Sequence, residues 1–591
     1  MHYPHAIRSY SYHLIILCAL TLCFNSASSL EIGLGHISDS IDNDTRPKEG
    51  NTIRLVAPRG GTATGVIVVR GNPAAAQARL SRDGLRQGRS HNLDDAVQIW
   101  YGSKQVDFGP NRGKDDSTSP YYDALIPRPV EASRVLPIYV HISVPEDAQP
   151  GGYSGTIEVR GRGGSQDFEL QVMVAPFVLP PPQQRHSWVD MLQSPDSVAY
   201  RYGVPLYSRQ HLQLMRPSLE KMARLGQRVM HVTAIARTML GNDEAMLPIG
   251  ERGIDWSGLE GYMALFNETV GAPKFVVVYA VERGGNTGSG DAPPHWTPPG
   301  GRRQGSTNAE EVAYSDRYRP AWKAAMEGIQ QRIQQAGWDD TEILIGWIGD
   351  ARPFGDYFSF FSEIAPFARW VQFTHARGDD SPRADGTLSV LGMDVAYRVL
   401  PYPPGNINRE LGAGQSAPSV DGWKGNFLNV TSMRQRNDQY HEVAFWLGQV
   451  PHATSSRGSA YRGVARIGMD FWTVPRPGGG SGRIIQTFQR WNNLQRDNAP
   501  AITAPGPEGA LPTVRYLAMA QGAQETEAFI WASKALQAGR LPQGANRNQA
   551  RELLDAWRNL RVVDPEIMAG ENEFEVLTAL YGFAGFAQGQ R

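Results

Sequence analysis

The stretch Ala321 to Pro353, AWKAAMEGIQQRIQQAGWDDTEILIGWIGDARP, decides the fold because it carries two structural periods in succession. Its first half repeats apolar residues at helical spacing, and Gly337 then ends the pattern. The repeating residues are Trp322, Met326, Ile329 and Ile333. The apolar run Ile343 to Trp347 predicts a buried strand, and a carboxylate, Asp350, follows it. A helix that leads directly into a buried strand is typical of α/β folds with parallel strands.

The same alternation of strands and helices extends from about residue 186 to residue 500. Eight apolar runs in this part are candidate strands, and eight strand-helix units predict a (β/α)8 TIM-like barrel. The runs begin near Trp188–Asp190, Arg228–Val232, Phe275–Tyr279, Ile343–Trp347, Trp370–Phe373, Val390–Asp394, Glu442–Trp446 and Gly468–Trp472.

Different patterns flank the predicted barrel on both sides. Residues 30–180 contain short alternating runs separated by Gly, Pro and Asp turns, which predicts a β-sandwich that ends at Leu179 and three prolines. Residues 505–591 are alanine-rich with helical spacing, which predicts a helical region packed on the barrel. The sequence therefore predicts an α/β multidomain protein.

The first 29 residues are typical of a secretory signal. Arg8 precedes the apolar run Leu14 to Phe24, and Ala27 and Ser29 are small residues before a cut at Leu30. We therefore expect a secreted or periplasmic protein without a membrane span in its mature chain. Both cysteines, at positions 18 and 23, lie inside this signal, so the mature chain has no disulfide and no cysteine zinc site.

Composition and charge exclude several classes of partner. The 591 residues have a formal net charge of −1, so no basic stripe for nucleic acid is expected. The histidines have no spacing that brings metal ligands together, and no dinucleotide or phosphate-binding motif occurs in a suitable context, so we expect neither a metal nor a cofactor. No pattern indicates an oligomeric state. A carbohydrate substrate remains compatible with this composition.

Four stretches together resemble the family 123 glycoside hydrolases and their relatives, in which a sandwich, a barrel and a helical tail follow one another. They cover most of the mature chain, and the stretch in the predicted sandwich is the most specific of them. They are Tyr121–Pro127 with Ser143–Val159 (SVPEDAQPGGYSGTIEV), Gly337–Pro353, Met469–Trp472, and Pro505–Ala528.

This resemblance implies a substrate-assisted reaction on glycosides of N-acetylgalactosamine. The 2-acetamido oxygen of the sugar attacks the anomeric carbon, an aspartate orients the acetamide, and the adjacent glutamate protonates the leaving oxygen. Asp350 falls on the aspartate, whereas Ala351 falls where the glutamate should be. A methyl group cannot donate a proton, and general acid catalysis is typically worth about 10²–10⁴-fold. Asp350 could also be a structural carboxylate that caps the following helix.

Other side chains are candidates for the same site. Glu282 follows the third strand and is the best replacement acid, although a salt bridge with Arg283 explains it equally well. Asp394 is expected at the end of the sixth strand as a substrate-binding group, although such an acid is more often structural. Trp296 and Trp472 offer aromatic faces for a sugar, whereas a core position is the ordinary explanation of a tryptophan near a strand.

These patterns predict a secreted glycan-active protein. The leading hypothesis is a glycoside hydrolase of amino-sugar (N-acetylhexosamine) glycosides with altered acid-base chemistry. The alternative is a non-catalytic glycan-binding or scaffold protein on the same fold. In both cases we expect Glu282, Asp350, Asp394 and Trp296 to gather at the carboxyl ends of the barrel strands.

Overall fold

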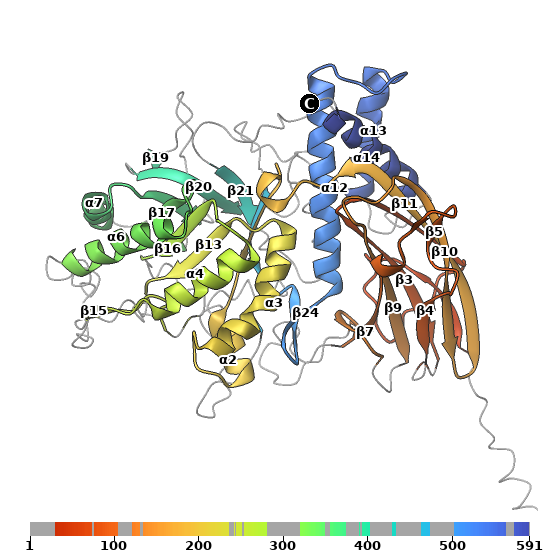
Figure 1. The fold of residues 1–591 in the computed structure, drawn as a ribbon, viewed down its shortest axis with the longest axis horizontal. Coiled ribbons are helices and arrows are strands. Elements are labelled where there is room, and N and C mark those ends of the chain that lie inside the picture. The colour runs from red at the N-terminus through yellow and green to blue at the C-terminus, as the bar shows by residue number, and fades with distance from the viewer. Residues whose placement is uncertain are drawn as a thin grey trace, which may run out of the picture.

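The computed structural model describes most of the chain, with gaps. The described residues are 30–71, 73, 76–104, 121–129, 134–235, 242, 244–250, 253–280, 319–348, 355–373, 389–390, 393–401, 428–432, 463–472, 501–562 and 572–589. They form a mixed α/β protein with several sheets and eight α-helices, which confirms the fold class predicted from the sequence at this level (Figure 1).

Two sheets form the first part of the chain and face each other across one apolar core. Alternate side chains of each sheet point into this core, among them Val69 and Val140 from one sheet and Ile157 and Leu170 from the other. The first sheet has the order β1 (Glu31–Gly35), β3 (Thr62–Arg70), β9 (Val135–Ser143), β7 (Val97–Ser103), β8 (Ala124–Ile126). The second has the order β2 (Thr52–Arg59), β11 (Gly164–Val178), β10 (Gly151–Gly161), β5 (Arg86–Gln87), β6 (His91–Asn92), with β4 (Gln77–Leu80) on β10. A short helix, η1 (Asp94–Ala96), precedes β7.

The middle part contains a single sheet whose eight path strands all run parallel. Their order is β12 (Trp188–Leu192), β22 (Gly463–Gly468), β21 (Leu428–Ser432), β20 (Met393–Pro401), β18 (Arg369–Phe373), β17 (Glu342–Ile348), β16 (Phe275–Tyr279), β13 (Val229–Thr233). A ninth strand, β19 (Ser389–Val390), pairs antiparallel with β20. In the described part of the chain no ladder joins β12 to β13, so a closed barrel is not found.

Three of the predicted strands lie elsewhere in the sequence. The sixth strand begins at Met393, where the prediction expected it to end. The seventh place in the sheet is occupied by β21, whereas the predicted run 442–446 lies outside the described residues. The eighth strand ends at Gly468, where the prediction began it. The apolar residues Met469, Phe471 and Trp472 are buried after the strand and do not pair within the sheet.

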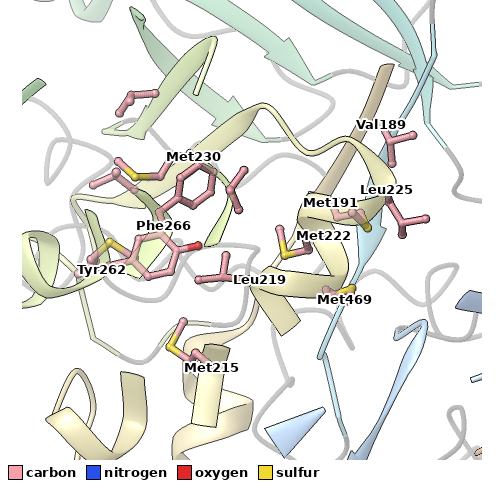
Figure 2. Close-up of a cluster of buried hydrophobic side chains, with 14 of the residues drawn as sticks. Val189, Met191, Met215, Leu219, Met222, Leu225, Met230, Tyr262, Phe266 and Met469 are labelled. Atoms are coloured by element: carbon pink, nitrogen blue, oxygen red, sulfur yellow. The ribbon is translucent and has the colours of Figure 1, made fainter. Parts of the chain in front are cut away.

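Helices cover the outer face of this sheet. The predicted helix of the opening stretch is α6, in which Trp322, Met326 and Ile329 are buried. Along β12, Val189 and Met191 face outward and lie beside Leu225 and Met222 of α3, as Figure 2 shows. The elements between the strands are α2 (Pro195–Tyr202), α3 (Arg209–Leu225), β14 (Ile249–Gly250), β15 (Gly253–Ile254), α4 (Ser257–Thr269), α6 (Arg319–Gln335) and α7 (Gly355–Ile364).

The last part of the chain joins the other two parts. The long helix α12 (Val514–Gln537) stands between the paired sheets and the parallel sheet (Figure 1). Its Arg515 forms a buried ion pair of 3.0 Å with Asp123, which lies just before β8. Glu527, also on α12, accepts hydrogen bonds from the backbone N–H groups of His186 and Ser187 in the connection to β12. The elements of this part and of that connection are η2 (Pro182–Gln184), β23 (Thr503–Gly506), β24 (Gly509–Pro512), α12 (Val514–Gln537), α13 (Arg547–Val562) and α14 (Glu573–Gly589).

Two further joints to the paired sheets use glutamine side chains. The amide of Gln524 on α12 accepts from the backbone N–H of Thr62 at 2.9 Å and donates to the carbonyl of the same residue at 2.5 Å. Gln588 on α14 makes the same two bonds with Val178, at 2.9 and 2.8 Å. The helical region therefore packs on the paired sheets as well as on the part that was predicted to be a barrel. No helix within the described ranges is long and apolar enough to cross a membrane.

Candidate functional site

The inner face of the parallel sheet begins with three packed aromatic rings. Trp188, Phe275 and Tyr397 come from β12, β16 and β20 and are buried. Their ring centroids are 5.7 to 5.9 Å apart, and the rings of Phe275 and Tyr397 are stacked at 16°. Such contacts stabilise a core beyond simple burial of area. These rings therefore fill this part of the inner face. The polar side chains of the inner face lie next to them.

A buried carboxylate, Asp190, collects three side-chain hydrogen bonds on this inner face. It follows Trp188 by two positions on β12, so both side chains point to the same side of the strand. Its Oδ2 accepts from the hydroxyl of Tyr397 at 2.7 Å. Its Oδ1 lies 2.8 Å from Nε2 of His231 and 3.2 Å from the amide nitrogen of Gln227. A fully buried carboxylate is stable only with such partners, and these bonds compensate for the water that Asp190 has lost.

His231 links this carboxylate to a tyrosine of the next strand. Its Nδ1 lies 3.0 Å from the hydroxyl of Tyr279, and the two rings are stacked at 17°. A carboxylate can only accept, so the Asp190 contact requires a proton on Nε2. In the neutral ring Nδ1 then accepts from the Tyr279 hydroxyl. The side chain of His231 is 10% exposed, whereas Asp190 is fully buried.

Burial and a nearby negative charge keep the hydroxyl of Tyr397 protonated. Burial and then the nearby negative charge of Asp190 raise the pKa of Tyr397 well above its usual range. The hydroxyl of Tyr397 therefore remains a donor to Asp190 over the whole physiological range of pH.

A glycine makes room for Tyr279 on the neighbouring strand. Tyr279 ends β16 and pairs with Gly346 of β17. A Cβ atom at position 346 would lie 3.1 Å from the Tyr279 ring and 2.7 Å from Cγ1 of Val277. The absence of a side chain on Gly346 therefore lets the phenol ring lie across β17 at the carboxyl end of the sheet.

Most of the predicted site residues lie outside the described residues. These are Glu282, Trp296, Asp350 and Ala351. The strands that precede two of them are described: β16 ends at Tyr279 and β17 at Ile348. Both strands run parallel and pair directly, so the chain leaves them at the same edge of the sheet. Their contribution to a site stays a prediction.

Asp394 lies at a different end of its strand from the one predicted. It is the second residue of β20, exposed, and at the amino end of the sheet. The prediction took Asp394 as the end of a strand because a charged residue follows an apolar run. The strand instead continues through the buried Val395 and Tyr397. Asp394 is therefore at the edge opposite to the carboxyl ends of β16 and β17.

Trp472 lies in the core. Its side chain is 1% exposed, and its indole N–H donates to the carbonyl of Thr503 at 3.1 Å. Its ring makes an edge contact with Tyr202 of α2. This placement agrees with the core position that the sequence left as the ordinary explanation of this tryptophan.

A second buried carboxylate, Asp470, follows β22. It accepts from the backbone N–H of Ser194 at 2.7 Å and from the amide of Gln193 at 3.0 Å, and Gln193 in turn accepts from Tyr262. Burial raises the pKa of Asp470 to about 6. Because Ser194 caps α2, this carboxylate connects the last strand to the first helix of the parallel sheet.

Sequence analysis missed the partners of Asp190. Gln227, Tyr279 and Tyr397 were not candidates, and His231 was set aside because no second histidine lies at a metal-binding spacing. The sequence did contain one signal for the inner face, which is that residues two positions apart in a strand point to the same side. Trp188 and Asp190 share one face in this way, as do Val229 and His231. Across the described ranges, no group of three His, Cys, Asp or Glu side chains could hold a metal ion.

Comparison with known proteins shows which family this chain resembles. Residues 192–380 match the family described as "Glycoside hydrolase 123, catalytic domain". The structure is similar to that of a family 123 glycoside hydrolase from Clostridium perfringens, studied for glycolipid glycan hydrolysis. The TM-score is 0.61 at 12% identity, over 95% of this chain and 99% of that chain. The chain resembles the family 123 glycoside hydrolases. The resemblance predicted from the sequence is thereby confirmed, and the catalytic-domain match supports glycoside hydrolase activity.

Two other solved structures are similar only in part. A Paenibacillus sp. cycloisomaltooligosaccharide glucanotransferase has a TM-score of 0.23 at 11% identity, over 66% of this chain and 53% of that chain. The Parabacteroides merdae beta-glucuronidase has a TM-score of 0.26 at 9% identity, over 80% of this chain and 50% of that chain. These scores are too low to inform on the site. No curated protein matches the chain.

Proposed function

We propose that this protein is a secreted glycoside hydrolase of amino-sugar (N-acetylhexosamine) glycosides with altered acid-base chemistry. The observation that carries the proposal is the match of residues 192–380 to a family 123 catalytic domain. This range includes the strands from β13 to β18 and the positions Glu282, Asp350 and Ala351. The signal pattern of the first 29 residues supports secretion or export to the periplasm.

We place the reaction at the carboxyl edge of the parallel sheet. In barrel enzymes the catalytic groups follow the carboxyl ends of the strands. Tyr279 and Gly346 lie at this edge of β16 and β17, next to the points where the chain leaves toward Glu282 and Asp350. The parallel order of eight strands supports the (β/α)8 barrel of residues 186–500, between a sandwich at 30–180 and a helical region at 505–591.

The mechanism that we propose uses the sugar as its own nucleophile. The 2-acetamido oxygen attacks the anomeric carbon while the Asp350 carboxylate orients the amide, and the bond to the leaving oxygen breaks. Ala351 supplies no proton to that oxygen. Glu282 is our proposed replacement acid, because it follows Tyr279, the last residue of β16, by three positions in the sequence.

The test compares two classes of substrate. The aryl oxide of an aryl glycoside leaves without being protonated. The sugar that leaves from a disaccharide of the same N-acetylhexosamine needs a proton on its oxygen. If no acid is present, the protein should cleave 4-nitrophenyl N-acetylhexosaminides far faster than the disaccharides. Ala351→Glu should then accelerate disaccharide cleavage by up to about 10²–10⁴-fold and change aryl cleavage little.

Two further variants locate the remaining groups. Asp350→Asn should slow both substrate classes, and Glu282→Gln should slow disaccharides alone if Glu282 is the acid. Glu327→Gln, on the exposed face of α6, serves as the control. No turnover by any variant, together with binding of N-acetylhexosamine oligosaccharides, would establish the non-catalytic alternative that Ala351 leaves open.

A further inference from the structure

The first two strands of the parallel sheet in sequence order, β12 and β13, approach each other without a backbone ladder between their described residues, and we call this junction the seam. β12 and β13 are the ends of the strand order, and among the residues that the structure describes no backbone ladder joins them. The outer side of this seam is covered by α3, whose Met222 and Leu225 lie close to Met191 and Val189 (Figure 2). The contacts that close the seam must therefore come from side chains on its inner side.

Gln227 supplies the first of these contacts. It lies two residues before β13, and its Oε1 accepts from the backbone N–H of Met191 at 2.8 Å. Its Nε2 donates to the carbonyl of Met191 at 3.2 Å, to that of Val229 at 2.6 Å and to Asp190 at 3.2 Å. Because Met191 is paired through both its N–H and its C=O, the glutamine amide replaces one step of the missing ladder.

Asp190 and His231 supply the second contact. They come from the two sides of the seam, and their side chains meet at 2.8 Å. The remaining oxygen of Asp190 is occupied by Tyr397, which fixes the carboxylate plane. A charge-assisted bond that is buried to this degree is stronger than a neutral one.

We propose that Gln227, Asp190 and His231 form a side-chain clasp that closes the sheet between β12 and β13 and holds Tyr279 as a donor to His231. These three are positioning residues for the site at the carboxyl edge, and this role rests on the function proposed above. The clasp fixes the proton on Nε2 of His231, so Nδ1 must accept from Tyr279. The hydroxyl proton of Tyr279 is then held by His231.

The contacts of His231 come from other strands of the sheet. Asp190 on β12 and Tyr279 on β16 lie against its ring, and Tyr397 on β20 lies beyond Asp190. The guanidinium of the adjacent Arg228 donates instead to the carbonyls of Arg185 and Ser187.

Amide hydrogen exchange of the full-length protein tests the clasp without any substrate. In Gln227→Met, the amide of Met191 loses its acceptor, so peptides covering β12 and β13 should exchange about 3- to 10-fold faster. Gln524→Met is the matched control, because Gln524 makes the same pair of bonds with Thr62 of β3 and not with β12 or β13. It should accelerate exchange around Thr62 and leave β12 and β13 unchanged. Unchanged exchange of β12 and β13 in Gln227→Met would overturn the clasp.

A double-mutant cycle tests the link to Tyr279. His231→Gln places an amide nitrogen near the position of Nε2, so it keeps the bond to Asp190 and loses the bond to Tyr279. We expect nearly wild-type exchange at the seam, together with a roughly 10- to 100-fold lower kcat/KM on an aryl N-acetylhexosaminide. Tyr279→Phe should cause a similar loss, and the double variant should lose no more than the worse single variant.

The split of the loss between kcat and KM distinguishes positioning from simple destabilisation. In His231→Gln and in Tyr279→Phe the loss should fall on kcat, with KM and the free energy of unfolding nearly unchanged, because the site is intact but misaligned. Multiplicative losses in the double variant, or a loss that accompanies a lower free energy of unfolding, would overturn the positioning role. If the wild type cleaves no glycoside, the proposed function has failed, whereas hydrogen exchange still decides whether the clasp exists.

Discussion

Replacing Asp470 by asparagine should change how the stability of the protein depends on pH. Asp470 is fully buried and accepts from the Ser194 N–H at 2.7 Å and the Gln193 amide at 3.0 Å. Burial raises its pKa from 3.8 to about 6. The native protein therefore holds a proton on Asp470 over a range of pH in which the unfolded chain has released it.

The magnitude follows from linkage between protonation and folding. Between pH 3.8 and about 6 the native state binds more protons at this site than the unfolded state, so stability falls as pH rises through this window. The shift is roughly two pKa units, which corresponds to about 3 kcal/mol in the free energy of unfolding. Above the folded pKa the loss is complete and no longer changes with pH.

Asparagine does not titrate, so the difference between the variant and the wild type isolates Asp470. The variant has one carbonyl oxygen instead of two acceptors, and the lost bond lowers its stability by a constant of about 1–3 kcal/mol. On top of this constant, the variant should gain about 2–3 kcal/mol relative to the wild type between pH 4 and pH 7. Urea unfolding of both proteins across this range measures the difference at each pH.

The test is whether the difference in unfolding free energy between the variant and the wild type changes with pH. A constant offset between the two proteins does not bear on the pKa of Asp470. Two parallel stability curves would refute the argument, because they would mean that Asp470 has the same pKa in the folded and unfolded states. Asp255→Asn is a suitable control. Hydrogen bonds from Ser257 lower the pKa of this exposed carboxylate, so any dependence should have the opposite sign.

Three further changes have expected outcomes. Arg515→Leu should lower the free energy of unfolding by about 3–5 kcal/mol, because it removes the ion-pair partner of the buried Asp123, and changing both residues to leucine should recover much of this loss in urea unfolding. Gly346→Ala should destabilise the protein by about 1–3 kcal/mol in thermal unfolding, since its Cβ would press on the Tyr279 ring, and an unchanged Tm would contradict the packing. Burial opposes ionisation of Glu527, but bonds from His186 and Ser187 lower its pKa below 4.5 overall. The stability that this carboxylate contributes should thus disappear as pH falls below 4.5 in the wild type and show no such loss in Glu527→Gln.

The sequence was most informative where a helical spacing of apolar residues, or an apolar run typical of a strand, continued without interruption. The helical spacing of Trp322, Met326 and Ile329 predicted α6, and five apolar runs predicted β12, β13, β16, β17 and β18. In these elements burial alone determines the pattern, so reading the pattern recovers the element. The predictions failed where apolar residues are buried for another reason, as at Phe471 and Trp472, which enter the core after β22 has ended.

The site was less predictable than the fold because its contacts join distant strands. Asp190 and His231 were visible as polar residues on strands, yet nothing in their spacing indicated that they meet. Strand parity could place each of them on the inner face, but only the folded chain brings β12 close to β13, the other end of the strand order. Gln227 was undetectable, because a glutamine before a strand is ordinarily a solvated loop residue.

The glutamine joints have a consequence for how the parts of this protein can be oriented. A β-ladder constrains its two strands to a narrow range of twist. A glutamine amide at the end of a flexible stem offers the same N–H and C=O pair without that constraint, and it carries no charge that salt could screen. Gln227, Gln524 and Gln588 use it to join a strand to a strand and two helices to strands. Deamidation at any of them would replace the donor by a second negatively charged oxygen facing a carbonyl. Chemical ageing of three side chains could thereby loosen the joints while every sheet and helix stays intact.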